Sequence, residues 1–171
     1  PVLHLFPHWN WNPGQTVDVW AYTNCDEVEL FLNGVSLGRR VKGDEDLHLM
    51  WRVEYQPGTL SGVGYKGGSE ILRKEIRTAG EPAALLLSPD RSEISADGSD
   101  LSFITVTLVD KDNIPVPDAD NLVKFSVEGP GTIAGVDNGL QTSMEPFKAD
   151  YRKAFNGKCL VVLKSGKEKG E

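Results

Sequence analysis

The chain has 171 residues, with 25 acidic against 18 basic side chains and a formal net charge of −7. This acidic balance argues against nucleic acid and anionic membranes as partners, because both attract basic surfaces. Hydrophobic residues make up 39% of the chain, enough for a buried core, and no apolar run approaches the roughly 20 residues that a membrane helix needs. The first residue is Pro1 and the last residues form a polar run, so we expect a piece of a longer protein.

The first predicted element is an aromatic segment from Phe6 to Trp11. Pro7 fixes its own φ and disfavours helix in the residue before it, so the segment is expected to be extended. Trp9 and Trp11 are two residues apart, and in an extended segment they face the same way. The turn Asn12-Pro13-Gly14 follows.

Strands with a period of two account for the rest of the first half. Val17, Val19 and Ala21 alternate with polar or aromatic residues, and a second strand covers residues 27–32. Asn33-Gly34 predicts a two-residue hairpin, because both central positions of a type I′ turn need φ > 0. Three more strands are predicted within 35–38, 47–54 and 59–66, and a polar one at 70–78. No helical periodicity occurs.

A domain boundary is predicted at 79–82, where Ala-Gly-Glu-Pro forms a small, flexible, proline-terminated link. Strands are expected after it at 83–87, 101–110, 123–127, 133–136 and 159–163. Residues 94–100 are expected to form an edge piece that contains the turn Ala96-Asp97-Gly98, and 111–121 is an irregular polar connection. The prediction is therefore an all-β protein of two tandem immunoglobulin-like antiparallel β-sandwiches, residues 1–80 and 81–171.

The first half resembles a known family in several quoted pieces. HLFPHWNW, AYTN, DEVELFLNG, SLG and WRVEYQPGTLSGVGY resemble, in order and spacing, the region after the catalytic barrel in bacterial glycoside hydrolase family 2 enzymes of the β-galactosidase-like group. The resemblance covers nearly the whole chain. It implies non-catalytic domains whose partner is their own upstream catalytic barrel, and a periplasmic or extracellular location.

The second half resembles an invasin-like, bacterial immunoglobulin-like module of the same hydrolases. The matching pieces are SPDRSEISADGSD, TVTLVDKDNIPVPDADNLVKFSVEGPGTI, GVDNG and RKAFNGKCLVVLKS. The resemblance implies one more strand and a glycine-leucine stretch after Ser165. KEKGE occurs there instead, so this sandwich either is cut short or ends in a different strand.

No catalytic residue is predicted. Retaining glycoside hydrolysis needs two carboxyl groups about 5–5.5 Å apart, but the neighbouring acidic residues Glu27 and Glu29 fit a solvated strand face. In the family the catalytic glutamates lie in the barrel, and no position here matches their motifs. No cofactor is expected either, since the chain has no glycine-rich phosphate loop and no nucleophile elbow.

No metal site is predicted. His4 and His8 have a helical ligand spacing on a segment that is not helical, and His48 has no partner in the sequence. The oxygen-rich loop from Asp110 to Asp120 leaves calcium as an alternative, but it lacks the spacing of an EF-hand and Asp and Asn are normal turn formers. Two further titratable groups, the cysteines at 25 and 159, are interpreted as two buried free thiols, with a bridge between the domains as the lesser alternative.

Four aromatic residues are the candidate binding residues: His8, Trp9, Trp11 and Trp20. One hypothesis is a flat platform of Trp9 and Trp11 that stacks on sugar rings. The other, which we favour, is packing against the barrel or within the first sandwich, because exposed paired tryptophans are costly unless they are used. Trp20 and Tyr22 extend the same surface.

The sequence thus predicts accessory, structural domains of a retaining β-galactosidase-like hydrolase, inactive by themselves and in contact with the barrel or with a second copy in an oligomer. Two alternatives from other classes stay open. One is a carbohydrate-binding module that holds sugar on Trp9 and Trp11. The other is a surface adhesin of tandem immunoglobulin-like repeats, which would have further copies of the second module and no barrel.

Overall fold

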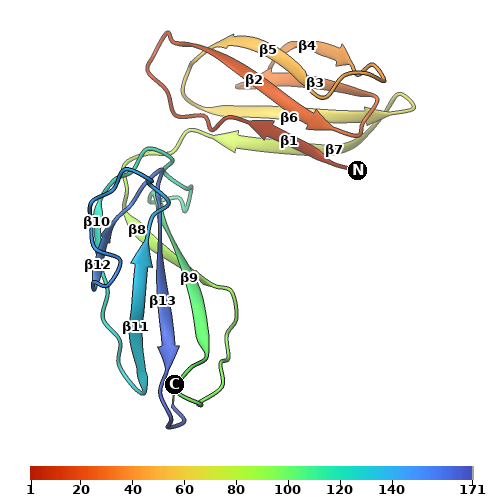
Figure 1. Cartoon of the computed structure of the whole chain (residues 1–171). Coiled ribbons are helices and arrows are strands. Elements are labelled where there is room, and N and C mark those ends of the chain that lie inside the picture. Colours follow the sequence, from red (N-terminus) through yellow and green to blue (C-terminus); the bar gives the residue numbers. More distant parts are fainter. Residues whose placement is uncertain (171) are drawn as a thin grey trace. The chain divides into compact units, whose positions relative to one another are not determined.

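The computed structural model describes residues 1–170 and contains thirteen β-strands (Figure 1). In that range no helix is long and apolar enough to cross a membrane. The chain divides into two compact units, of which the first is Pro1–Thr78 and the second begins at Ala79. Each unit is built from antiparallel strands, so the all-β prediction is confirmed.

The first unit is a sandwich of a three-stranded sheet, in the order β1-β2-β5, and a four-stranded sheet, in the order β4-β3-β6-β7. The strands are β1 (Leu3–Phe6), β2 (Thr16–Thr23), β3 (Glu27–Leu32), β4 (Val35–Val41), β5 (Leu49–Glu54), β6 (Thr59–Lys66) and β7 (Ser69–Arg77). Asn33 and Gly34 both have positive φ between β3 and β4, as the predicted hairpin turn requires.

Apolar residues alternate with polar ones along the strands of the first unit, and this places its core between the two sheets. Val17, Val19 and Ala21 of β2 are buried and pack with Leu30 and Leu60 from the opposite sheet. Two glycines of β6 allow side chains of the opposite layer to approach its backbone closely. A Cβ on Gly64 would lie 2.6 Å from Cys25 Sγ, and a Cβ on Gly62 would lie 3.0 Å from Leu5 Cδ2. β1 therefore lies directly over β6 and closes the core.

The second unit has a four-stranded sheet in the order β11-β13-β9-β8 and a two-stranded layer, β10-β12. The strands are β8 (Ala84–Pro89), β9 (Leu101–Val109), β10 (Leu122–Lys124), β11 (Gly131–Asp137), β12 (Tyr151–Lys153) and β13 (Lys158–Ser165). Val106, Leu108 and Val161 of the large sheet are buried and share a core with Val123 of β10 and with Ala154, the residue after β12.

Three local predictions have clear outcomes. Residues 94–100 form no edge strand, but the turn predicted at Ala96-Asp97-Gly98 is present: Asp97 Oδ1 accepts hydrogen bonds from the Ser99 and Asp100 amides, and Gly98 has positive φ. The irregular connection predicted at 111–121 is confirmed as a run without a named strand. Cys25 and Cys159 are free and buried, as expected.

All four tryptophans, Trp9, Trp11, Trp20 and Trp51, belong to the first unit.

Candidate functional site

Trp9 is a core residue and presents no surface. Its side chain has 0% exposure and meets the Tyr55 ring edge-on, with the ring centroids 5.3 Å apart. Its indole Nε1 donates to the Gln56 carbonyl oxygen at 3.0 Å, so the one polar atom of the ring is satisfied inside the unit. The burial of Trp9 therefore agrees with the favoured hypothesis of packing within the first sandwich, and the alternative platform with Trp11 does not form.

The platform fails because the segment after β1 is not extended. The backbone bends at Pro7 and again at Trp9, so the rule that residues two apart share a face does not apply. Trp11 instead stacks on the His8 ring, with centroids 4.7 Å apart and planes inclined by 13°, and its Nε1 donates to the His8 carbonyl at 2.8 Å. Trp11 is half-buried against the core, and His8 is exposed beside it.

Trp20 is the centre of an exposed aromatic cluster on the outer face of the β1-β2-β5 sheet. The register pairs it with Phe6 on one side and Met50 on the other. Its ring centroid lies 6.0 Å from that of Phe6, 4.9 Å from that of His48 and 6.5 Å from that of Tyr22. We call these five residues, Phe6, Trp20, Tyr22, His48 and Met50, the aromatic patch.

The aromatic patch is open to solvent at its edges, and its centre holds a hydrogen-bond donor without a partner among the described residues. Phe6, Tyr22 and Met50 are 50%, 40% and 38% exposed. The Trp20 Nε1 atom is buried and has no hydrogen-bond partner among the described residues. Leaving a buried donor unpaired costs about 1–3 kcal/mol, so the stability of this unit alone does not account for a tryptophan at this position.

A polar pair borders the patch on the same face. Asp18 and Arg52 lie opposite each other in the β2–β5 register, next to the pair of Trp20 and Met50. Arg52 donates to both carboxylate oxygens of Asp18, at 2.9 and 3.4 Å, and this hydrogen bonding holds the pKa of Asp18 below its usual value. Both side chains are exposed, so solvent screens the pair.

The sequence identified Trp20 and Tyr22 and missed His48 and Met50. A usable signal was present: these residues are large or aromatic side chains on the phase of β2 and β5 that points away from the core. In a strand with one solvated face, that phase normally carries polar residues. His48 precedes β5 and its position beside Trp20 depends on strand pairing, which one sequence does not give.

The neighbouring carboxylates of β3, Glu27 and Glu29, are not arranged as an acid–base pair. Glu29 accepts hydrogen bonds from Ser36 Oγ at 2.7 Å and from the Tyr65 hydroxyl and Arg39, and these lower its pKa. A general acid in glycoside hydrolysis needs a raised pKa, so Glu29 is unsuited to that role. Its neighbour Glu27 is engaged by the same Arg39.

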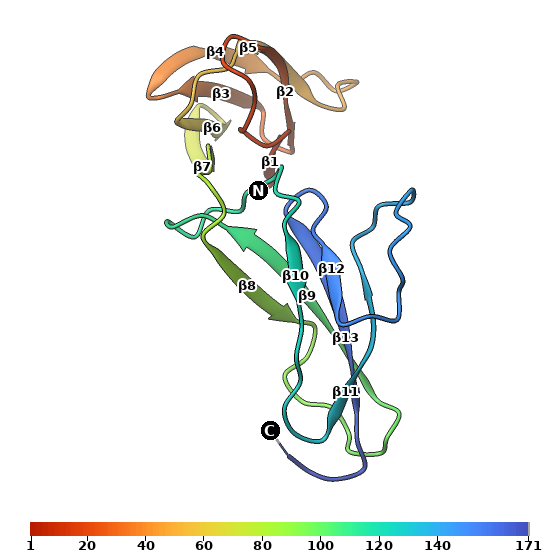
Figure 2. The ribbon, with the colours of Figure 1, turned by 90° about the vertical axis from the view of Figure 1, so that its left-hand side faces the viewer.

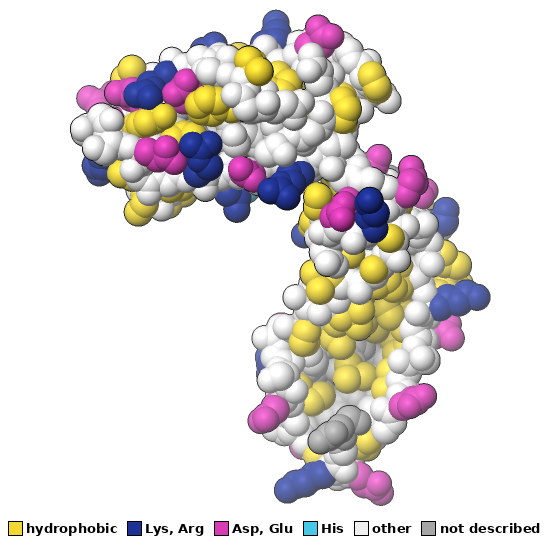
Figure 3. All heavy atoms as spheres, turned by 180° about the vertical axis from the view of Figure 1, so that it is seen from behind, with side chains coloured by type: hydrophobic (Ala, Val, Ile, Leu, Met, Phe, Trp, Pro, Cys, Tyr) yellow, Lys and Arg dark blue, Asp and Glu magenta, His cyan; other side chains and the backbone are white. Residues whose placement is uncertain are grey.

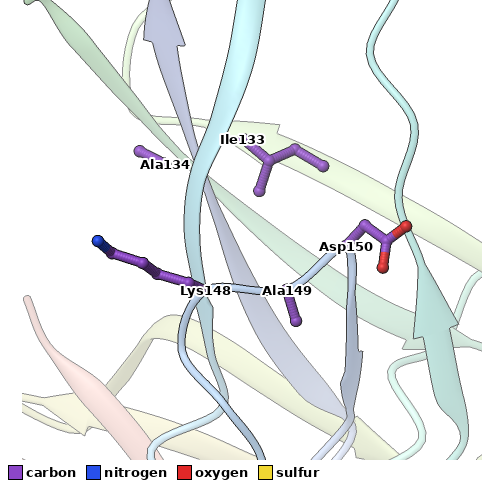
Figure 4. A pocket seen from close by; sticks show the side chains of 5 residues that line it. All are labelled: Ile133, Ala134, Lys148, Ala149 and Asp150. Carbon is purple, nitrogen blue, oxygen red and sulfur yellow. The ribbon is translucent and has the colours of Figure 1, made fainter.

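Two further places combine polar side chains with a cavity or a loop, and neither forms a reactive site. A cavity of about 470 Å³ in the second unit is lined by Ile133, Ala134, Lys148, Ala149 and Asp150. Figure 4 shows Lys148 and Asp150 pointing to opposite sides, so they do not face a common reacting atom. The Asp110 loop is organised by backbone groups: the Asp110 carboxylate accepts from the amides of Gly80, Asp112 and Ile114. Among residues 1–170 no group of three His, Cys, Asp or Glu side chains is placed to hold a metal ion.

Comparisons with known proteins agree over both units. Residues 85–171 match the family model "Glycoside hydrolase family 2 C-terminal domain 5", and residues 14–72 match a domain of unknown function, DUF4982. The chain is 54% identical to the β-galactosidase BoGH2A of Bacteroides ovatus, an alignment that covers 99% of this chain and 20% of that protein. The chain thus spans about a fifth of that relative's length.

Solved structures give the same result. A β-glycosidase from Bacteroides vulgatus superposes with a TM-score of 0.91 at 39% identity, covering 98% of this chain and 22% of that one. A glycosyl hydrolase family 2 member from Bacteroides cellulosilyticus superposes with a TM-score of 0.90 at 44% identity, covering 95% and 23%. The invasin-like resemblance of the second half stays a prediction.

Proposed function

Because the chain belongs to glycoside hydrolase family 2 and is a non-catalytic part of its C-terminal region, we propose that its first unit docks onto the catalytic domain of a β-galactosidase-like enzyme. In this proposal the whole protein hydrolyses terminal β-galactosides, and the carboxylates that do so lie outside these 171 residues. The chain supports the catalytic domain and takes no part in bond cleavage.

The aromatic patch is the observation that carries the proposal. A contiguous exposed apolar surface on a folded domain commonly marks an interaction site. Aromatic side chains contribute much of the binding energy at such sites. Phe6 and Met50 are exposed on either side of Trp20, and the Asp18–Arg52 pair supplies a polar border. An apolar centre with a polar rim is the usual composition of a protein interface.

The test uses the full-length enzyme with the double substitution Phe6→Ser/Met50→Ser. The matched control is Val35→Ser/Val41→Ser, which removes two exposed apolar side chains from β4 of the same unit. We expect the initial rate of aryl β-galactoside hydrolysis to be unchanged in both. The patch variant should lose activity several-fold faster on heating, while the control keeps the wild-type half-life. Equal half-lives in the three proteins would contradict docking through this patch.

Carbohydrate binding at the patch is the second candidate, favoured by the Asp18–Arg52 pair beside the Trp20 ring. Aromatic rings with adjacent charged hydrogen-bonding groups suit the apolar and hydroxyl faces of a sugar. Calorimetric titration of the 171-residue chain with galactose, lactose and a galactan oligosaccharide separates the two. Saturable binding that disappears in Trp20→Ala and persists in Trp11→Ala would replace docking by sugar binding, and no heat with all three sugars would leave docking.

A further inference from the structure

Strand β8 is a free, apolar edge of the second unit. It is the last strand of the sheet order β11-β13-β9-β8, so among the described residues it pairs with β9 and with no other strand. Leu85, Leu86 and Leu87 at its centre are 48%, 54% and 56% exposed. Figure 2 shows β8 along the outer margin of this unit, with β9 on its inner side. Edge strands are usually protected by charged side chains or by a covering segment, whereas β8 carries no charge and all its residues are exposed.

The leucines make this edge apolar on both faces of the sheet. The register pairs Leu85 with Leu108 and Leu87 with Val106, and these two partners in β9 are 2% and 0% exposed. Directly paired residues of an antiparallel sheet project from the same face, so Leu85 and Leu87 lie on the core face. Figure 3 shows apolar side chains gathered on one side of the second unit and bordered by polar groups. Leu86 projects from the opposite, outer face, so a strand added to this edge would cover leucine on both faces.

The hydrogen bonds of β9 show which backbone groups of β8 face outward. The register places Leu108 opposite Leu85. The Leu108 amide donates to the Gly157 carbonyl at 2.8 Å, and the Leu108 carbonyl accepts from the Val116 amide at 2.9 Å. Both backbone groups of Leu108 are thus bonded away from β8. In an antiparallel ladder, residues that share hydrogen bonds alternate with residues that do not. The amides and carbonyls of Leu85 and Leu87 therefore point to the free edge.

We propose that two copies of this chain associate by pairing their β8 strands antiparallel, with the twofold axis at Leu86, so that one continuous sheet runs through both copies. The Leu85 amide and carbonyl bond to the carbonyl and amide of the partner's Leu87, and the symmetric pair does the same. The side chains of Leu85 and of the partner's Leu87 meet on the core face, and the two Leu86 side chains meet on the outer face. This interface belongs to the second unit and does not depend on the docking function proposed for the first.

The backbone selects this register among those that a twofold pairing allows. Because Leu85 and Leu87 face outward, the axis can lie at Leu85, at Leu86 or at Leu87. An axis at Leu85 would set Leu87 opposite the partner's Ala83, whose amide already donates to a β9 carbonyl at 2.8 Å. An axis at Leu87 would set Leu85 opposite the partner's Pro89, which has no amide hydrogen. The axis at Leu86 is the one that uses the donor and the acceptor of both outward-facing leucines.

Charge complementarity is the reason for a second copy as the occupant. With the axis at Leu86, Glu81 lies opposite the partner's Arg91, and by symmetry Arg91 lies opposite the partner's Glu81. Glu81 is exposed, and the Arg91 side chain stays 52% exposed beside Asp90 and Asp100 of its own chain. A parallel pairing would instead bring like charges together. The antiparallel pairing of identical edges is also closed by its symmetry, so it stops at two copies.

Disulfide cross-linking of three single-cysteine variants tests the register. In the proposed pairing the Cα atoms of the two Leu86 residues lie about 4.5 Å apart, as in opposite residues that share no hydrogen bonds, and a disulfide spans that distance. Leu85→Cys and Leu87→Cys are the matched controls. Their exposure is similar, but each lies about 7–8 Å from the same residue of the partner. Each variant of the 171-residue chain is oxidised at the same concentration, and peptide mass spectrometry separates the new disulfide from Cys25 and Cys159.

We expect Leu86→Cys to give about tenfold more cross-linked dimer than either control, because residues that far apart cannot be bridged without movement of the backbone. A mixture of Leu85→Cys and Leu87→Cys should cross-link, since these positions lie opposite each other. Leu86→Cys in the full-length enzyme should form the same disulfide. Equal yields from the three single variants, or no Leu86→Cys disulfide in the full-length enzyme, would overturn the proposal.

Sedimentation velocity of the unsubstituted chain is the second measurement. We expect a dimer that forms with rising concentration and that Leu87→Lys converts to monomer, because lysine disfavours the pairing of edge strands. Leu122→Lys, at a 50% exposed position of β10 in the same unit, should leave the dimer intact. An unsubstituted chain that stays monomeric at every concentration, or a Leu87→Lys chain that dimerises as well as the wild type, would show that β8 is not the interface.

Discussion

Trp9 and Trp20 show how one residue type takes opposite positions within 12 residues of sequence. Trp9 is fully buried and hydrogen-bonded to Gln56, whereas Trp20 lies on the outer face with an unpaired indole nitrogen. Composition and spacing identified both as candidates. They did not reveal which was buried, because the bends at Pro7 and Trp9 are set by contacts with Tyr55 and Thr78, far along the chain.

Replacing Trp9 by Ala should destabilise the first unit by about 3–5 kcal/mol, the range for large aromatic residues in cores. The measurement is native-state hydrogen exchange at the buried amides of β2 and β5. Trp11→Ala is the control, and its effect should be clearly smaller because Trp11 is half-buried and stacks on an exposed histidine. Equal losses in the two variants would mean that Trp9 is not the residue that fills this core.

Arg152 is the buried residue that sequence reasoning overlooked. Its side chain is 1% exposed, and it donates to the Glu145 carbonyl at 3.0 Å and to Asn138 Oδ1 at 3.1 Å. It also forms ion pairs with Asp137 and Glu145. Arginine is almost never buried without such partners, and partners contributed by a distant loop are not visible in a single sequence.

Replacing Arg152 by Met should cost about 1–3 kcal/mol, because the Glu145 carbonyl and the Asn138 amide oxygen lose their donor. Hydrogen exchange should become faster in residues 138–147, the loop that Arg152 anchors. Arg91→Met, which removes an exposed ion pair with Asp90, should cost no more than about 1 kcal/mol. An Arg152→Met loop that exchanges at the wild-type rate would show that other contacts hold it.

At the scale of elements, the sequence predicted most strands because their apolar residues alternate. β2, β5 and β9 each bury one phase, which is the pattern that a period-two reading detects. The edge piece expected at 94–100 forms no strand, because side-chain acceptors of Asp97 and Asp100 bind the backbone amides instead, and only the turn at Ala96-Asp97-Gly98 matches the prediction. β8 was predicted as a strand, and all six of its residues are exposed. The sequence of β8 does not show this exposure, because it depends on whether another layer covers the sheet.

The turn after β9 should make the second unit sensitive to acid. Hydrogen bonds from the Gly80, Ile114 and Asp112 amides hold the pKa of Asp110 below its usual value. The ionised Asp110 carboxylate therefore contributes its full stabilisation above the unfolded-state pKa of about 3.9. This stabilisation is lost as pH falls through the lower folded-state pKa, where the carboxylate becomes protonated.

The check is urea unfolding of wild type and Asp110→Ala at neutral pH and at about pH 3, near the pKa range of a carboxyl group. The difference between their midpoints should be large at neutral pH and should shrink in acid. Asp112→Ala is the control, since its side chain is exposed and should give a small difference at both values. If the difference between the two urea midpoints does not change with pH, the charge of Asp110 does not stabilise the second unit.

At the scale of the whole molecule, the chain has two separate cores. One cluster of buried residues spans Leu3 to Leu60, and the other spans Ala79 to Val161. The prediction of two consecutive sandwiches came from the small, proline-terminated link at 79–82, and the two compact units divide before Ala79. The resemblance of the second half had already left open whether this sandwich is complete, whereas alternation alone shows which residues face inward but not whether a partner layer exists.

Val106→Ala should lower the stability of the second unit by about 2 kcal/mol, from the lost methyl groups and the cavity they leave. Val106 has 0% exposure and belongs only to the second cluster. The free energy of opening, measured by hydrogen exchange, should fall for β9 and β13 and stay unchanged for β2 and β5. Equal loosening of the two sets would mean that the cores unfold as one.

The location of all four tryptophans in the first unit has a spectroscopic consequence. Tryptophan fluorescence excited at the red edge of protein absorbance therefore comes from the first unit alone. A binding or folding event confined to the second unit does not change this fluorescence. Phe103 of β9, 43% exposed on the outer face of the second unit, is a suitable place for an added indole. With Phe103→Trp beside the wild type, the two halves of the chain can be followed separately in one cuvette.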